Sequence, residues 1–188
     1  MRIQGVTGDL PAVAHLGPQA PAAVVSAAAG TILASAGPEQ GAASIVLAPD
    51  GLTISGPTPK RLAFGGAQAS VLADVGAALG EPNEQGIQEE CPAGPLYHAL
   101  YASGLQVVFQ DDKFVGWSAR EGSSFRTEQG IGAGSTVSEL KKAYPAATVE
   151  ESSLGHEFAA GDLYGVVTGP SDTAAVEMMF AGTNCIFR

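Results

Sequence analysis

Apolar and polar residues alternate with a period of two in several short segments, which is the pattern of a strand with one buried face. One such segment, LQVVFQ at 105–110, places glutamines opposite its apolar residues. Another, VEMMF at 176–180, carries a glutamate in the polar position. The alternation predicts that the buried residues of these two strands are Leu105, Val107, Phe109, Val176, Met178 and Phe180.

Two tight turns are predicted between apolar runs. The tripeptide PDG at 49–51 interrupts the run at 44–56, and these residue types favour a hairpin turn. The tripeptide DDK at 111–113 separates the strand at 105–110 from a run that begins at Phe114. Both turns predict antiparallel strand pairs.

A helical period appears in the segment 62–82. Val71, Val75 and Leu79 form an apolar stripe there, and Gly80 follows as a residue that commonly ends a helix. The sequence therefore predicts one helix that packs through this stripe.

A second helix is predicted in GIGAGSTVSELKKAYP at 130–145. Thr136 is a favourable N-cap residue, and Glu139 stands three positions later, which is the pattern of a capping box. The preceding glycines do not make a phosphate cradle. A Walker-type loop requires a lysine directly after its last glycine, but Ser135 follows Gly134 and the next lysine is Lys141. A dinucleotide fingerprint needs a third glycine where this chain has Val137. The segment is predicted to be the structural start of a helix.

Beyond residue 60 the chain gives the same order of elements twice, namely a glycine-bearing turn, one helix and several apolar runs. One constant offset aligns Leu96 with Leu154, His98 with His156, Leu100 with Phe158, Ala102 with Ala160, and Leu105 with Leu163. Such internal similarity predicts a repeat. We predict an α+β fold of two tandem helix-plus-antiparallel-sheet units, at 44–125 and 126–188, preceded by an irregular arm rich in alanine, proline and glycine at 1–43.

Charge excludes several classes of partner. The chain has 188 residues, with 19 acidic and 9 basic side chains and a formal net charge of −10. Such a chain repels nucleic acid and anionic membrane surfaces, so we predict no nucleic-acid partner.

The segment 21–36 is apolar and ends in the small residues of a signal-peptidase site, but little basic charge precedes it. It is either a signal-peptide remnant or an N-terminal strand or helix, and we predict no stable membrane span.

Two stretches carry a resemblance to known proteins. GSTVSELKKAYP at 134–145 and FQDDKFVGW at 109–117 resemble segments of bacterial secreted proteins. The tandem order of elements over 60–188 resembles the β-lactamase-inhibitor-protein-like modules and is similar to small lipoprotein modules of outer-membrane assembly. The resemblance implies a binding fold in a periplasmic or secreted protein. It implies no target, because no inhibitor contact residue can be matched to this chain.

The two cysteines, Cys91 and Cys185, have no local partner. They form no Cys-x-x-Cys pair, and their spacing from His98 and His156 fits no zinc finger. A long-range disulfide in an oxidising compartment and two buried thiols in a cytosolic protein both remain open. We predict the disulfide, because the cysteines lie in separate predicted units.

The histidines give the alternative function, a small hydrolase that uses His98 or His156 as its base. The chain holds neither a Gly-x-Ser-x-Gly elbow nor a His-Glu-x-x-His motif, and a general base also needs a positioned nucleophile. We therefore prefer a non-catalytic module with no catalytic residue, cofactor or metal. Its partner would be a protein or a small molecule.

The predicted partner-binding surface is aromatic with an acidic edge. If 96–100 is a regular strand with Leu96, His98 and Leu100 on its buried side, the tyrosines that flank them are exposed. Aromatic side chains are common at binding hot spots, although a lone tryptophan also serves as a core anchor. Adjacent glutamates favour a basic partner. The predicted partner-binding residues are Tyr97, Tyr101, Trp117, Glu89 and Glu90.

Overall fold

The structure is a computed structural model that describes residues 44–186 of the chain. The predicted arm at 1–43 lies outside these residues, as does the segment 21–36. The described part contains twelve strands and two helices. It is a mostly β protein.

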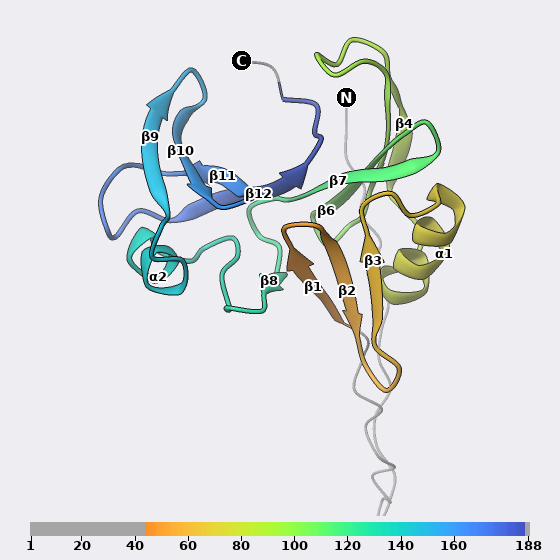
Figure 1. Cartoon of the computed structure of the whole chain (residues 1–188), viewed down its shortest axis with the longest axis horizontal. Coiled ribbons are helices and arrows are strands. Elements are labelled where there is room, and N and C mark those ends of the chain that lie inside the picture. The colour runs from red at the N-terminus through yellow and green to blue at the C-terminus, as the bar shows by residue number, and fades with distance from the viewer. Residues whose placement is uncertain (1–43, 187–188) are drawn as a thin grey trace, which may run out of the picture. The chain divides into compact units, whose positions relative to one another are not determined.

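Eight strands form one antiparallel sheet, which is the largest element in Figure 1. The halves of this sheet come from different parts of the sequence and join where β7 pairs with β12. Every neighbouring pair is antiparallel. In spatial order the strands are β4 (Glu84–Gln88), β5 (Leu96–Leu100), β6 (Leu105–Gln110), β7 (Lys113–Ala119), β12 (Val176–Gly182), β11 (Leu163–Val167), β10 (Gly155–Ala160) and β9 (Thr148–Ser152).

A smaller sheet has the spatial order β3 (Lys60–Ala63), β2 (Gly51–Ser55), β1 (Ser44–Ala48) and β8 (Arg126–Thr127). The predicted hairpin at 44–56 is confirmed, because β1 and β2 are antiparallel and the turn lies between Ala48 and Gly51. β8 pairs with β1 in parallel. The small sheet therefore joins strands from both predicted units.

Both predicted helices form. α1 (Gln68–Leu79) buries Val71 and Val75 and ends at Gly80, as the stripe predicted. α2 (Val137–Ala143) begins at a complete capping box, in which Thr136 Oγ1 accepts from the Glu139 backbone N–H and Glu139 accepts from the Thr136 N–H. The two backbone donors at this helix start are thereby satisfied.

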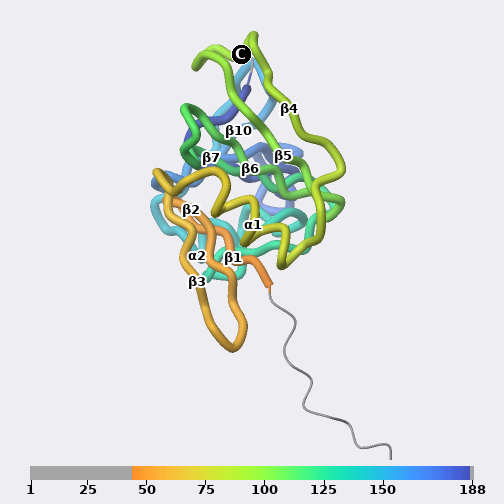
Figure 2. Tube along the Cα trace, turned by 90° about the vertical axis from the view of Figure 1, so that its right-hand side faces the viewer, coloured from red at the N-terminus to blue at the C-terminus, as the bar shows by residue number. Residues whose placement is uncertain are grey.

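One hydrophobic core lies between the large sheet, the two helices and the small sheet. In Figure 1 the helices and the small sheet lie on one side of the large sheet, and Figure 2 follows the chain from α1 (yellow) into the edge strand β4. We call this side of the large sheet the helix face. Its buried side chains include Ala99, Val107, Phe109, Trp117, Phe158 and Met179.

The predicted α+β class of two helix-plus-sheet units is wrong. The segments 44–125 and 126–188 do not close separate sheets, because β7 and β12 hydrogen-bond along Met179–Gly182 and make one continuous sheet. The two helices make up only a small share of the described residues, since α2 is only seven residues long. The local pattern of apolar and polar residues predicted the strands. It did not predict the pairing of strands that are far apart in the sequence.

One predicted alternation is wrong in its phase. Val176 and Phe180 are buried as expected, but Met179 and Ala181 lie in the main core, whereas Met178 and Phe180 lie on the opposite side of the sheet. The register between β11 and β12 shifts beside Val176, so that one extra residue enters β12. Such a bulge reverses the faces of all later residues in a strand. The alternation at Leu105, Val107 and Phe109 is confirmed, and all three are buried.

The side of β5 was also predicted wrongly. Ala99 and Tyr101 lie in the main core on the helix face, with Tyr97 packed against it. Leu96 belongs to a separate cluster on the opposite side of the sheet. β5 is buried on both sides along part of its length, so its apolar residues do not identify the helix face.

Candidate functional site

The side of the large sheet opposite the helix face carries no helix or strand of the described residues, and we call it the open face. In Figure 1 the strands at both ends of the sheet rise on this side, away from α1 and α2. Cross-strand pairing assigns alternate residues to it. The open face includes Leu96, His98, Val108, Tyr164, Val166 and Met178.

The segment after β12 crosses the centre of this face. A Cβ atom built on Gly116 would lie 2.0 Å from the carbonyl O of Thr183, so only glycine leaves room for the crossing. Thr183 also donates its backbone N–H to the Val115 carbonyl at 2.8 Å. The chain then reaches Cys185, which is bonded to Cys91 in the connection between β4 and β5. The predicted disulfide is confirmed.

The disulfide covers the β5–β6 half of the open face. Cys91 packs with Leu96 and Val108 in a small buried cluster, and Cys185 lies against it. The disulfide and the segment 183–186 therefore cover this half of the open face, where no described helix packs. The other half, formed by β9 to β12, has no such cover among the described residues.

A hollow of about 410 Å³ lies on the open face beside this segment. Both apolar and polar side chains line it, which is the usual composition of a small binding site. Its lining residues are Leu154, Val166, Met178, Cys185, Ile186, Gln106, Ser118, Arg120 and Asn184. Arg120 is positioned by a hydrogen bond from its guanidinium to Gln106 Oε1 at 3.3 Å.

An aromatic pair extends the open face beyond this hollow. The rings of Tyr164 and Phe180 stack with centroids 5.9 Å apart, and Tyr164 is 38% exposed. Next to them Glu157 and Glu150 stand directly opposite each other on β10 and β9. Both residues are acidic, so they add negative charge to this end of the sheet.

Two predicted site residues are not exposed. Trp117 is 0% exposed, which confirms the alternative of a core anchor, and Tyr101 is 2% exposed, so its predicted place on an exposed surface is wrong. Both side chains fill the core on the helix face. An intact fold does not present the Trp117 ring to a partner.

The other predicted site residues lie near β4. Tyr97 is half-buried and donates a hydrogen bond from its hydroxyl to Gln85 Oε1 at 2.7 Å. Glu89 and Glu90 are exposed after β4, in the connection that holds Cys91. Partner binding by Tyr97, Glu89 and Glu90 remains a prediction.

Sequence reasoning missed Tyr164 and Met178. Tyr164 alternates with Leu163 and Gly165, which are buried, so period-two alternation in β11 could have found it. Met178 reaches the open face only because of the bulge in β12. No pattern within β12 signals that bulge.

The histidines lie on opposite faces of the sheet. His98 is on the open face, and its Nε2 is 3.5 Å from Glu84 Oε1. His156 shares the side of Phe158, because the two are spaced by two residues in β10. Among residues 44–186 neither histidine has a hydrogen-bonded serine or threonine hydroxyl, and both cysteines are oxidised. The histidines therefore cannot act together, and neither has a positioned nucleophile.

Residues 44–186 show neither a cluster of metal ligands nor a membrane-spanning helix. Within residues 44–186 no three histidine, cysteine, aspartate or glutamate side chains converge as metal ligands. None of the helices described there has the length and apolar character needed to cross a bilayer.

No protein-family model, curated protein or solved structure matches this chain. The resemblance to β-lactamase-inhibitor-protein-like modules therefore remains a prediction.

Proposed function

We propose that this protein is a non-catalytic binding module of the periplasm or the extracellular space, and that its open face binds another protein with a basic surface. The observation that carries the proposal is the hollow beside Val166 and Met178, with the exposed Tyr164 next to it. Apolar centres with polar rims are typical of protein interfaces, and tyrosine is enriched at their hot spots. An apolar side chain of the partner would enter the hollow.

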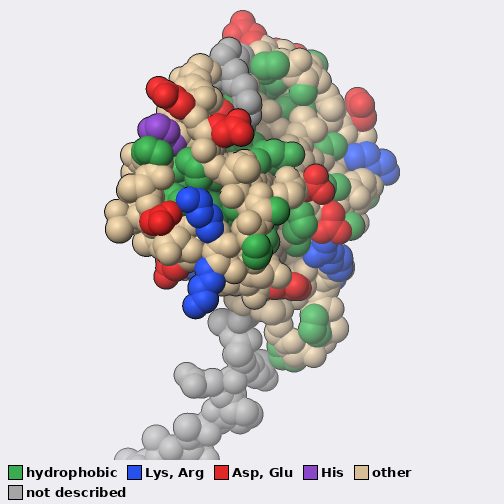
Figure 3. Space-filling model, turned by 60° about the vertical axis from the view of Figure 1, so that its left-hand side comes forward, with side chains coloured by type: hydrophobic (Ala, Val, Ile, Leu, Met, Phe, Trp, Pro, Cys, Tyr) green, Lys and Arg blue, Asp and Glu red, His purple; other side chains and the backbone are tan. Residues whose placement is uncertain are grey.

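Charge supports a basic partner. Glu84 lies at one end of the open face, and Glu150 lies at the other. The whole chain has a formal net charge of −10, so its long-range field attracts a basic protein. Figure 3 shows one face of the molecule, on which acidic and basic side chains are interspersed among apolar ones.

The arrangement of the histidines favours a binding module over a hydrolase. His98 and His156 lie on opposite faces of the sheet, so one substrate cannot contact both. Among residues 44–186 the side chain paired with His98 is that of Glu84, which carries no hydroxyl or thiol nucleophile.

The disulfide supports the extracytoplasmic location. Disulfides persist in the periplasm and outside the cell, and they are rare where cytosolic reductants act. This bond holds the segment 183–186 across the open face. In the proposed function it therefore shapes the wall of the hollow as well as stabilising the chain.

The experiment is a comparative capture followed by titration. The wild-type protein is immobilised and exposed to the periplasmic and secreted proteins of the source organism, in parallel with Tyr164→Ala and Met178→Lys. A protein retained by the wild type is purified and titrated by calorimetry against all three. We expect each substitution to weaken binding by more than about 1 kcal/mol, and added salt to weaken it further.

The matched control is Ile87→Ala. Ile87 is also an exposed apolar residue, but it is paired with Tyr97 and so lies on the helix side of β4. Its replacement should leave the titration unchanged. Equal affinity of the partner for the wild type and for both open-face variants would contradict the proposal.

A further inference from the structure

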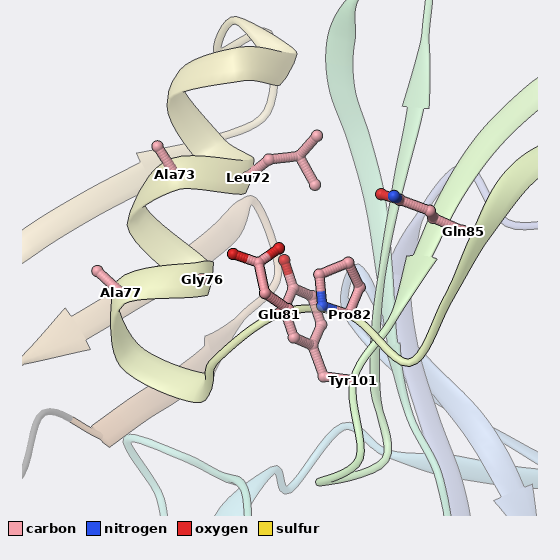
Figure 4. A pocket seen from close by; sticks show the side chains of 8 residues that line it. All are labelled: Leu72, Ala73, Gly76, Ala77, Glu81, Pro82, Gln85 and Tyr101. Carbon is pink, nitrogen blue, oxygen red and sulfur yellow. The ribbon is translucent and has the colours of Figure 1, made fainter.

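A second concave site lies on the helix side of the sheet, between α1 and the edge strand β4. It is an open pocket of about 470 Å³, shown in Figure 4, and we call it the α1–β4 groove. The residues that line it are Leu72, Ala73, Gly76, Ala77, Glu81, Pro82, Gln85 and Tyr101. None of them belongs to the open face hollow.

Small residues make the groove. Ala73, Gly76 and Ala77 face it from α1, and a Cβ atom built on Gly76 would meet nothing within 4 Å. Glycine inside a helix costs roughly 0.5 to 1 kcal/mol relative to alanine, and no contact in the fold requires it here. The helix wall is therefore set back from β4, and the space belongs to no side chain of the described residues.

The floor of the groove holds a polar atom without a partner. Tyr101 is 2% exposed, and its hydroxyl makes no hydrogen bond within residues 44–186. In Figure 4 this hydroxyl points into the space between α1 and β4. A buried hydroxyl that lacks a partner is costly, and a ligand group in the groove would supply one.

A carboxylate lies over the same space. Glu81 follows α1 and extends over the groove in Figure 4, and its charge is among the causes of the raised pKa of Tyr101, after burial. No lysine, arginine or histidine nitrogen of the described residues lies within 4.0 Å of this carboxylate. The polar side chains of the groove are those of Glu81, Tyr101 and Gln85, and the Gln85 oxygen already accepts a hydrogen bond from Tyr97. The carboxylate and the Tyr101 hydroxyl together suit a cation that donates hydrogen bonds.

The neighbouring strand edge indicates where the cation comes from. β4 is an edge strand of the large sheet, so one side of its backbone has no strand partner in the described structure. Ile87 is 62% exposed and lies two residues from Gln85, on the same side of β4. An extended polypeptide paired with β4 would place one side chain on Ile87 and the side chain two residues away at the mouth of the groove.

We infer that the α1–β4 groove binds a lysine or arginine side chain of an extended polypeptide segment that adds to the edge of β4. The ammonium or guanidinium group donates to the Glu81 carboxylate and to the oxygen of the Tyr101 hydroxyl. An apolar side chain two residues away packs on Ile87. The site is independent of the open face, and either can fail without the other.

The probe is a fluorescently labelled, end-capped peptide, TVTKTVT, whose valines flank the lysine at the spacing of one strand face. Fluorescence anisotropy against the full-length protein measures its affinity. The matched peptides TVTETVT and TVTQTVT replace the cation by an anion and by a neutral amide. We expect TVTKTVT to bind with a Kd below about 1 mM and the glutamate peptide to bind at least about tenfold more weakly.

Three variants test the groove itself. Glu81→Gln removes the charge and should weaken TVTKTVT about tenfold, since that pair is the main ionic contact. Tyr101→Phe removes a hydroxyl that the fold does not use, and should weaken the peptide a few-fold without lowering Tm. Gly76→Leu fills the groove from a position with open space and should abolish binding. Glu128→Gln, an equal change of charge in another loop, is the control and should change nothing.

Several outcomes overturn the inference. If the protein binds TVTKTVT and TVTETVT equally, or if the wild type and Glu81→Gln bind TVTKTVT equally, the groove does not recognise a cation. Butylammonium chloride serves as a competitor that carries the cation without a backbone. If it binds as tightly as the peptide, the site takes free amines and the polypeptide source is wrong. Retention of peptide binding in a folded Gly76→Leu protein would place binding outside the groove.

Discussion

The indole Nε1 of Trp117 donates a hydrogen bond to the carbonyl O of Ala48 at 2.9 Å, and both residues are buried. Trp117 lies in β7 of the large sheet, and Ala48 ends β1 of the small sheet. This bond therefore joins the two sheets across the core. It also explains why the one tryptophan of the chain is an internal residue, with its ring in the core and its polar atom satisfied.

Trp117→Phe should lower the free energy of unfolding by about 2 to 4 kcal/mol. The substitution leaves the Ala48 carbonyl without its donor and opens a void beside it. Urea denaturation followed by circular dichroism measures the change. Tyr164→Phe, on the exposed side, is the control and should stay within about 0.5 kcal/mol. A Trp117→Phe protein as stable as the control would show that the sheets are held together elsewhere.

Local sequence signals predicted local structure here. The capping box at Thr136 and Glu139 and the hairpin turn before Gly51 are each decided by a few adjacent residues, and both are observed. The pairing of β7 with β12 joins residues far apart in sequence, so no local pattern could specify it. The wrong fold class follows from that missing pairing.

The site was less predictable than the fold. Tyr101 was expected outside because alternation gives two faces but does not say which one meets a helix. The open face depends on a bulge in β12 and on the crossing of Thr183 over Gly116, which are tertiary features. Counting residues fixed only the partners of the predicted disulfide, because two cysteines allow one pairing, and the structure shows that Cys91 and Cys185 form it.

Cys91→Ser together with Cys185→Ser should lower the free energy of unfolding by up to about 4 to 5 kcal/mol. The bond closes a loop with a sequence separation of 94, and loops of that length give the largest entropic effect on the unfolded chain. Denaturation of the wild type with and without reductant gives an independent measurement. Equal stability of the oxidised and reduced proteins would contradict the prediction.

Gly116→Ala should destabilise the protein by about 1 to 3 kcal/mol, the range for a forced overlap in a packed site. Its Cβ atom would lie 2.0 Å from the Thr183 carbonyl O, so the segment after β12 must move. Gly86→Ala in β4 is the matched control, because the nearest heavy atom to its Cβ would be 3.9 Å away, on His98. Thermal unfolding compares the two. A larger loss in Gly86→Ala would mean that the crossing is not constrained at Gly116.

Acid should weaken the start of α2. The backbone N–H of Thr136 donates to Glu139 and, with the Thr136 hydroxyl, holds the pKa of that carboxyl below its ordinary 4.5. A lowered folded-state pKa contributes stability above the unfolded value, and this contribution is lost as pH falls through the folded one. In Glu139→Gln the loss of stability between pH 5 and pH 3, read from urea midpoints at low salt, should therefore be smaller than in the wild type. An identical decline in both proteins would exclude the capping box as a cause.

Alkali should weaken the fold through Tyr101. Burial first, and then the charges of Glu81 and Tyr97, raise the pKa of its hydroxyl above the ordinary 10.0. Below that value the tyrosine is neutral in both states and its full contribution to stability is present. Above it the unfolded chain ionises while the folded residue keeps its proton, so stability is lost as pH rises through the folded pKa.

Tyr101→Phe has no proton to lose, and its urea midpoint should fall less between about pH 9 and about pH 11 than that of the wild type. Tyr164→Phe, which removes an exposed hydroxyl, is the control and should follow the wild-type decline. A decline in Tyr101→Phe as steep as in the other two proteins would show that burial does not raise the pKa of the Tyr101 hydroxyl.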